Sequence, residues 1–231
     1  MMLREGGALF SRLYRGFGSL GERGPKDGAP LMVIPGFLAS DRTTLGLQRA
    51  LAGAGYRVSG WGMGLNRGVR PDTLERIVSR AESFAGGRPV VLVGWSLGGI
   101  YAREAAKLRP ELVSKVVTLA SPFSGDRRNN NVWRLYEFVA GHPVTDPPVG
   151  TDPGVKPPVP TLAIWSSRDG IVAPYAARGE AGESDKSLEI PTTHMGFAVS
   201  GSAYPKIVEA IRDFASLSEG RGGGPAELVE G

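Results

Sequence analysis

Three side chains of this chain could together activate a hydroxyl group as a nucleophile: Ser96, His194 and Asp169. A serine hydroxyl is a weak nucleophile until a neighbouring base accepts its proton, and that base needs an acidic partner to fix its tautomer. Ser96 is the central residue of a Gly-x-Ser-x-Gly motif at residues 94–98. This motif is typical of a serine held on a tight turn between a strand and a helix.

The base is chosen from only two histidines, His142 and His194. His194 directly follows the last predicted strand, whereas His142 lies in a proline-rich segment between elements. The carboxyl ends of parallel strands meet at one edge of a sheet, so a residue at a strand exit can reach Ser96. We therefore expect His194 to be the base, and His142 to be solvated or packed within the insertion.

The acid should also follow a strand, and Asp169 does so in the sequence Ser166-Ser167-Arg168-Asp169-Gly170. Two other roles are open for Asp169: a turn residue bonded to its own backbone, or a surface ion pair with Arg168. Four further carboxylates are less well placed, two within the insertion and two beside the final strand: Asp146, Asp152, Asp185 and Glu189.

The segments around Ser96 have the pattern that such a turn requires. Residues 89–94 are a continuous apolar run, typical of a strand buried in a parallel sheet, and residues 97–108 have helical periodicity. Gly94 and Gly98 would allow the strand and the helix to approach closely. The alternative is a glycine-rich turn without catalytic function.

A developing oxyanion needs two N–H donors directed at it. Leu97, the residue after the nucleophile, would provide one from the amino end of its helix. Phe37 would provide the other, because it follows the first predicted strand, and Gly36 keeps that turn narrow. The alternative for residues 35–37 is a simple apolar turn.

Strands and helices alternate along the rest of the chain, which predicts a doubly wound, mostly parallel sheet of α/β class. The predicted strands are residues 31–35, 56–61, 89–94, 113–120, 160–165 and 187–190. The predicted helices are residues 44–54, 71–85, 98–108 and 204–217.

We divide the chain into an N-terminal arm or short helix at residues 1–29, one α/β domain at 30–218, and a glycine-rich, disordered tail at 219–231. An insertion at 122–158 forms a short cap. Its aromatic residues either form the core of a short helix or line an acyl pocket. The candidate substrate-binding residues are Trp95, beside the nucleophile, and three in the insertion: Trp133, Tyr136 and Phe138.

The composition excludes several classes of function. The 231 residues carry a net charge of only +4 without a basic block, so we expect no nucleic-acid partner. The absence of cysteine excludes thiolate catalysis, and the sequence holds neither a phosphate-binding glycine fingerprint nor a metal-ligand cluster, so we expect no cofactor and no metal. Without an export signal or a transmembrane run, we expect a cytoplasmic protein. Membrane contact would be at most weak and through the N-terminal segment, where arginines alternate with Phe and Leu.

From about residue 31 to residue 217, the chain resembles the α/β-hydrolase family. The resemblance lies in the order Ser96, Asp169, His194 and in three segments: residues 94–99, 169–174 and 194–196. It implies a Ser-His-Asp catalytic triad, a strand order 2-1-3-4-5-6 and oxyanion donors at Phe37 and Leu97. One departure is Pro35-Gly36, where many members have His-Gly, and another is that two leading antiparallel strands lack a counterpart, so we expect six strands.

Among family members, the chain looks most like small bacterial lipases and esterases with a short cap. This implies hydrolysis of carboxylic esters with short to medium acyl chains through an acyl-enzyme. The same residues would serve a thioesterase, an acyltransferase or a carrier-protein methyl esterase. A non-enzymatic, hydrolase-like binding protein is a further alternative, although it would be expected to lack a triad member. The sequence leaves the oligomeric state open.

Overall fold

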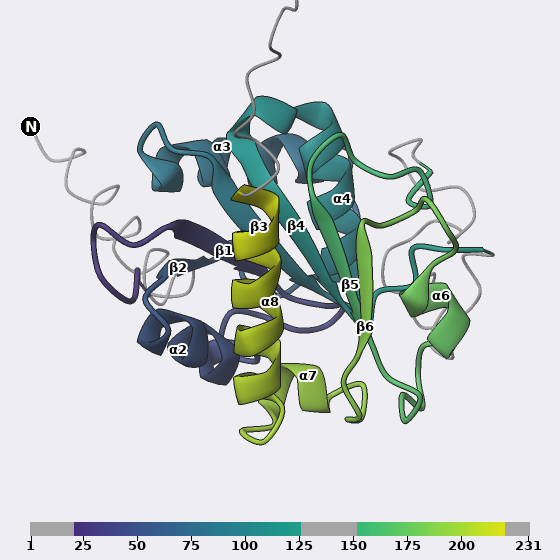
Figure 1. The fold of residues 1–231 in the computed structure, drawn as a ribbon. Coiled ribbons are helices and arrows are strands. Elements are labelled where there is room, and N and C mark those ends of the chain that lie inside the picture. The colour runs from purple at the N-terminus through teal and green to yellow at the C-terminus, as the bar shows by residue number, and fades with distance from the viewer. Residues whose placement is uncertain (1–20, 126–151, 220–231) are drawn as a thin grey trace, which may run out of the picture.

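A computed structural model describes residues 21–125 and 152–219 of the chain and places a parallel sheet at its centre (Figure 1). The six strands run in the order β2-β1-β3-β4-β5-β6, and every neighbouring pair is parallel. Their bounds are β1 Pro30–Ile34, β2 Arg57–Gly60, β3 Val90–Trp95, β4 Val113–Leu119, β5 Thr161–Trp165 and β6 Lys186–Glu189. The predicted fold class, strand number and strand order are confirmed.

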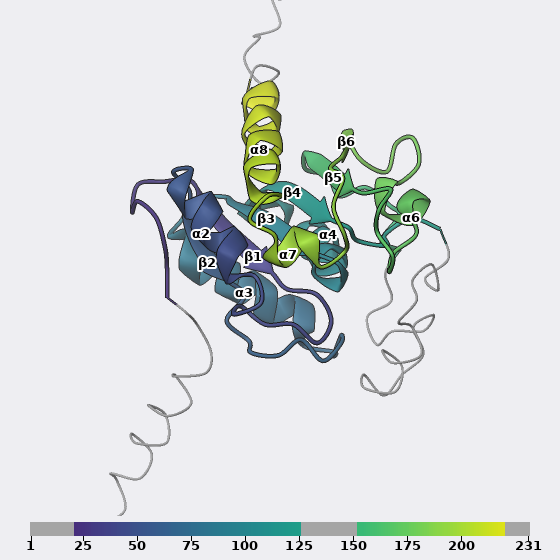
Figure 2. The ribbon, with the colours of Figure 1, turned by 90° about the horizontal axis from the view of Figure 1, so that it is seen from below.

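Four long helices cover the sheet, as the sequence predicted: α2 Leu45–Gly53, α3 Thr73–Ala85, α4 Leu97–Leu108 and α8 Tyr204–Glu219. In Figure 2, α8 and α3 lie on opposite sides of the sheet. Three short elements were not predicted: the 3-10 turn η1 Pro110–Leu112, α6 Pro174–Arg178 and α7 Gly196–Val199. None exceeds five residues, so hydrophobic periodicity cannot reveal them.

Two hydrophobic clusters form the core, one on each face of the sheet. Leu31 and Val33 of β1 pack with α2 and α8, whereas Met32 and Ile34 pack with α3 and α4. Successive side chains of a strand point to opposite faces, so a strand covered on both sides must be apolar throughout. All residues of β1 and β3 are buried, which explains their continuous apolar sequences.

The outer edge of β2 is partly covered by the chain before β1. Arg23 and Val58 form an antiparallel bridge, with N···O distances of 2.9 and 2.7 Å between their backbone groups. An uncovered strand edge is a template for pairing with another chain. This bridge pairs the backbone N–H and C=O of Val58 at the edge, and it adds no seventh strand to the described part of the chain.

The approach of α4 to the sheet depends on glycines at both ends of the turn that carries Ser96. A Cβ added to Gly94 would overlap the backbone of Gly98, and a Cβ added to Gly98 would overlap the backbone of Ile34 at the end of β1. Backbone atoms cannot rotate out of the way as a side chain can. The closeness of α4 to β1 and β3 therefore requires glycine at both positions.

We predict that Gly98→Ala destabilises the protein by about 3 kcal/mol, because α4 must shift away from β1. Gly53→Ala is the matched control, since Gly53 lies in α2 with no atom near its added Cβ. It should instead stabilise the protein by about 0.5 kcal/mol, through a lower entropy of the unfolded chain. Urea unfolding of the three proteins measures both effects, and equal stabilities would contradict this account of the helix position.

Candidate active site

Ser96 lies on the turn between β3 and α4, with backbone angles φ 55° and ψ −125°. This sparsely populated conformation costs a residue with a side chain about 1–3 kcal/mol. The backbone is held by hydrogen bonds from Ser96 N to Leu119 O at 2.8 Å and from Gly99 N to Ser96 O at 3.0 Å. Ser96 remains partly exposed although every residue of the preceding strand is buried. The turn thus places a hydroxyl at the accessible edge of the sheet.

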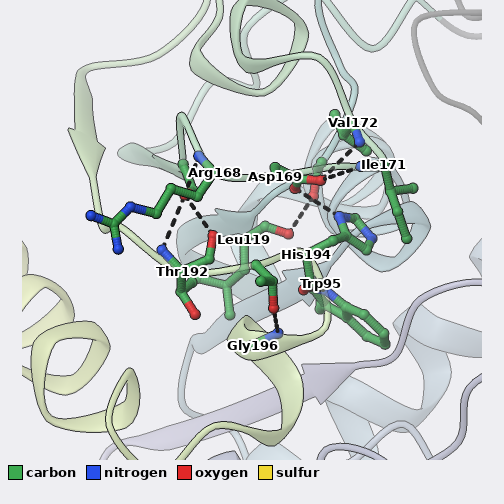
Figure 3. Close-up of polar contacts among 12 residues, drawn as sticks. Trp95, Leu119, Arg168, Asp169, Ile171, Val172, Thr192, His194 and Gly196 are labelled. Atoms are coloured by element: carbon green, nitrogen blue, oxygen red, sulfur yellow. Dashed lines mark hydrogen bonds and ion pairs between the residues drawn. The ribbon is translucent and has the colours of Figure 1, made fainter.

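Asp169 lies in the loop after β5 and contacts the imidazole of His194 (Figure 3). Its Oδ2 lies 2.8 Å from His194 Nδ1, and its Oδ1 accepts backbone N–H bonds from Ile171 at 2.8 Å and Val172 at 2.9 Å. The exposed fractions of the two side chains are 6% for His194 and 2% for Asp169. Two N–H donors and an imidazole therefore compensate for the burial of this carboxylate.

The hydroxyl of Ser166 joins the Asp169 loop to the His194 loop. It donates to Thr192 O at 2.6 Å and accepts from Thr192 N at 3.1 Å and Arg168 N at 3.0 Å. Ser166 is itself buried. The sequence analysis missed this role, because a serine that follows a strand has no local pattern that identifies its partners 26 residues away.

His194 lies next to the nucleophile turn because Trp95 contacts it directly. The indole Nε1 donates to His194 O at 3.1 Å, and the two rings lie 5.4 Å apart between centroids. Trp95 is the residue before Ser96, so these contacts bring the imidazole to the turn. With Nδ1 occupied by Asp169, the Nε2 atom is available to accept a proton. The side chain of Trp95 is buried and contacts His194, and the substrate contact expected for Trp95 from the sequence stays a prediction.

The segments that carry the two expected N–H donors lie next to Ser96. Leu97 is the first residue of α4, where backbone N–H groups have no acceptor within the helix. Gly36, which precedes Phe37, lies against the turn, because a Cβ added to it would be 3.0 Å from Ser96 Cβ and 3.1 Å from the Trp95 ring. The exits of β1 and β3 therefore meet at Ser96, as expected for neighbouring strands.

The other residues considered from the sequence do not join this group. Asp185 lies at the opposite end of β5 and accepts from Thr161 N at 2.7 Å, while Glu189 accepts from Ser167 N at 3.1 Å and Asp152 accepts from Gly154 N at 3.0 Å. The remaining candidates lie outside the described residues: Trp133, Tyr136, Phe138, His142 and Asp146.

Neither a metal-binding cluster nor a membrane-spanning helix occurs in residues 21–125 and 152–219. No three acidic or histidine side chains there gather in an arrangement that could hold a metal ion. No helix there is long and apolar enough to cross a bilayer.

Asp41 joins the loop after β1 to the loop after β2. Its Oδ1 accepts from Trp61 N at 2.9 Å and its Oδ2 from Gly62 N at 3.0 Å, while the side chain is buried. Burial raises the pKa of this carboxyl to about 6, although the two N–H bonds and the charge of Arg80 act in the opposite direction. The neutral form is therefore favoured in the folded protein relative to the unfolded chain.

We predict that Asp41 lowers the stability of the protein as the pH rises from about 4 to above 6. In that window the folded protein binds more protons at this site than the unfolded chain, whose carboxyl has the ordinary pKa of 3.8. The side chain of the Asp41→Asn variant cannot ionise, so the variant lacks this loss of stability. The free energy of unfolding of the variant minus that of the original protein should therefore increase from pH 4 to pH 8. Urea unfolding across this range tests it, and parallel pH profiles of the two proteins would contradict it.

Comparison with known families identifies one match over most of the chain. The alpha/beta hydrolase family matches residues 31–212. This range contains five strands in full, β1 except for its first residue Pro30, and the residues Ser96, Asp169 and His194. None of the curated protein sequences compared with the chain matches it significantly.

Several solved structures have a similar fold. A candidate lipase from Acinetobacter baumannii has a TM-score of 0.65 at 13% identity, with 93% of this chain and 97% of that chain covered. A monoacylglycerol lipase from Paleococcus ferrophilus has a TM-score of 0.59 at 17% identity, with 84% and 98% covered. A thioesterase domain from the curacin biosynthetic pathway has a TM-score of 0.60 at 13% identity, with 83% and 93% covered. At these identities the similarity shows the fold alone.

Proposed function

The chain belongs to the alpha/beta hydrolase family, and we propose that it is a serine hydrolase that cleaves carboxylic esters through an acyl-enzyme. The observation that supports this most directly is the buried contact of 2.8 Å between Asp169 Oδ2 and His194 Nδ1, held beside the strained turn of Ser96. A buried acid and base joined in this way, next to a partly exposed serine, have the geometry that nucleophilic catalysis requires.

In the proposed reaction, Ser96 Oγ attacks the carbonyl carbon of the ester while His194 Nε2 takes the hydroxyl proton. Asp169 stabilises the resulting imidazolium, and the N–H groups of Leu97 and Phe37 stabilise the oxyanion. The tetrahedral intermediate then collapses, the alcohol leaves with the proton from His194, and an acyl group remains on Ser96. A water molecule activated by His194 releases the acid by the same two steps and restores the serine.

Apolar side chains around this edge support an acyl substrate. Four large hydrophobic residues are exposed on the segments that follow β1, β2 and β6, with exposed fractions of 41–54%: Leu38, Leu65, Met195 and, at the end of α7, Val199. The proposal is for short to medium acyl chains. A thioesterase, an acyltransferase or a carrier-protein methyl esterase would use the same catalytic groups, and the curacin thioesterase domain has a similar fold.

We predict that Ser96→Ala lowers ester hydrolysis by at least about 10³-fold while the protein stays folded. The loss follows from removal of the attacking oxygen, whereas Ser79→Ala, an exposed serine on α3, should leave the rate unchanged. The rates are measured on nitrophenyl esters from acetate to palmitate, and on the matching thioesters to separate the alternative. Covalent labelling by a fluorophosphonate, mapped to its peptide, should occur at residue 96. Hydrolysis by Ser96→Ala at the original rate would refute the nucleophile.

We predict nearly as large a loss for His194→Ala, because the serine then has no group to accept its proton. His142→Ala should change the rate less than about twofold, since the sequence places it away from the strand exits. Both variants are assayed with the same nitrophenyl ester under saturating conditions. A large loss in His142→Ala with an active His194→Ala would mean that the base was assigned wrongly.

A further inference from the structure

Asn66 is a fully buried polar residue in the loop after β2, and the proposed reaction gives it no role. Burial of an amide is unfavourable unless its groups are hydrogen-bonded. The bonds of Asn66 are directed at one short segment, the turn after β1 that contains Phe37. This concentration of bonds suggests that Asn66 determines the shape of that turn.

The turn itself spans residues 36–39 and is strained. Ala39 N donates to Gly36 O at 3.1 Å, which closes a four-residue turn. Its third residue is Leu38, with φ 55°, and a positive φ costs a non-glycine residue about 1–3 kcal/mol. The one hydrogen bond within the turn does not by itself hold this strained shape, so contacts from elsewhere are needed to stabilise it.

Asn66 provides three of these contacts. Its Nδ2 donates to Pro35 O at 2.9 Å, its backbone O accepts from Leu38 N at 2.7 Å, and its backbone N donates to Ala39 O at 2.8 Å. Most substitutions of Asn66 would keep its two backbone contacts. The bond to Pro35 O depends on the side-chain amide.

The amide of Asn66 is in turn held from the opposite side. Its Oδ1 accepts from Gly68 N at 3.1 Å and from the Tyr101 hydroxyl at 3.4 Å. Tyr101 belongs to α4, the helix that begins at Leu97. Asn66 thus connects the turn that carries one expected oxyanion donor to the helix that carries the other.

These bonds fix the peptide planes on either side of Phe37 N. Pro35 O belongs to the peptide before Gly36, and Leu38 N belongs to the peptide after Phe37, and Asn66 binds both. The peptide between them has its carbonyl, Gly36 O, turned toward Ala39 N. Because a trans peptide directs its C=O and N–H in opposite directions, the N–H of Phe37 is directed away from the turn. Gly36 lies beside Ser96, since a Cβ added to Gly36 would be 3.0 Å from Ser96 Cβ.

We propose that Asn66 is a positioning residue that aims the Phe37 N–H at the oxyanion formed on Ser96. This inference rests on the proposed hydrolase function and adds to it a residue outside the catalytic triad. Oxyanion donors stabilise the transition state more than the bound ester, so a misaligned donor lowers kcat and leaves KM nearly unchanged. A residue with a purely structural role would instead reduce the amount of folded enzyme without changing the kinetics of each folded molecule.

The test compares Asn66→Ser with Thr161→Val in ester hydrolysis. Asn66→Ser removes the bond to Pro35 O, and we expect kcat to fall about 10- to 100-fold with KM within about twofold, since complete loss of one donor costs about 10²–10³. Thr161→Val removes the bond of Thr161 Oγ1 to Asp185 Oδ2 and that from Asp185 N, at the opposite end of β5. It should lower stability but leave kcat unchanged for the folded fraction.

Phenylboronic acid gives a second measurement, because its tetrahedral adduct with Ser96 places an oxygen where the oxyanion forms. Its affinity for Asn66→Ser should fall in parallel with kcat. Asn66→Leu is the second variant, because it keeps the approximate shape of the side chain and has neither a donor to Pro35 O nor a charge. It should show the same loss in kcat.

The possible outcomes separate this proposal from the proposed function. If the original protein neither hydrolyses esters nor reacts with a fluorophosphonate at Ser96, the hydrolase function is refuted. If it does both, and a folded Asn66 variant keeps its kcat within twofold, only the role of Asn66 is refuted. Equal losses in kcat for Thr161→Val and Asn66→Ser would refute it too. Failure of both Asn66 variants to fold would make Asn66 a structural residue and also overturn the proposal.

Discussion

The packing of α4 directly on the backbone of β1 and β3 is the constraint on which the candidate site depends. It requires Gly94 and Gly98, and it places Ser96 on the turn where the helix begins. Because α4 is rigid, segments that bond to its later residues are fixed relative to Ser96. Tyr101 reaches the loop after β2 through Asn66, and Arg103 reaches the chain that returns to β5.

Arg103 shows how a buried charge can serve this arrangement. Its guanidinium donates to Pro153 O at 2.7 Å and Glu183 O at 2.8 Å, and it lies 4.2 Å from the centre of the Phe123 ring. Burial lowers the pKa of Arg103 to about 10, so it stays charged at neutral pH. Backbone carbonyls replace the water that the cation loses. The two described ends of the insertion, near Phe123 and Pro153, are therefore fixed to the same helix as Ser96.

The sequence predicted those features that repeat along it or occur at strand exits. Six strands in the order 2-1-3-4-5-6 follow from apolar runs and the family resemblance, and Asp169 and His194 were placed together because both follow strands. The hydrogen bonds of Ser166, Asn66 and Trp95 were not predicted. Each depends on which backbone atoms meet a single polar group in three dimensions, and no local periodicity encodes this. The position of Trp95 beside Ser96 does not reveal which side of the turn its ring occupies, so its contact with His194 could not be predicted.

Backbone strain gives independent support for this location of the site. Among the residues that the structure describes, the non-glycine residues with positive φ are Leu38, Ser96 and Ala120, and they follow the neighbouring strands β1, β3 and β4. Each donates its N–H to a carbonyl: Leu38 to Asn66 at 2.7 Å, Ser96 to Leu119 at 2.8 Å and Ala120 to Ile164 at 2.8 Å. Strain of about 1–3 kcal/mol per residue persists only where surrounding contacts hold the backbone. Strands β4 and β5 supply the contacts of Ser96 and Ala120, and the loop after β2 supplies that of Leu38. The energy of folding therefore maintains conformations that an isolated loop would not adopt.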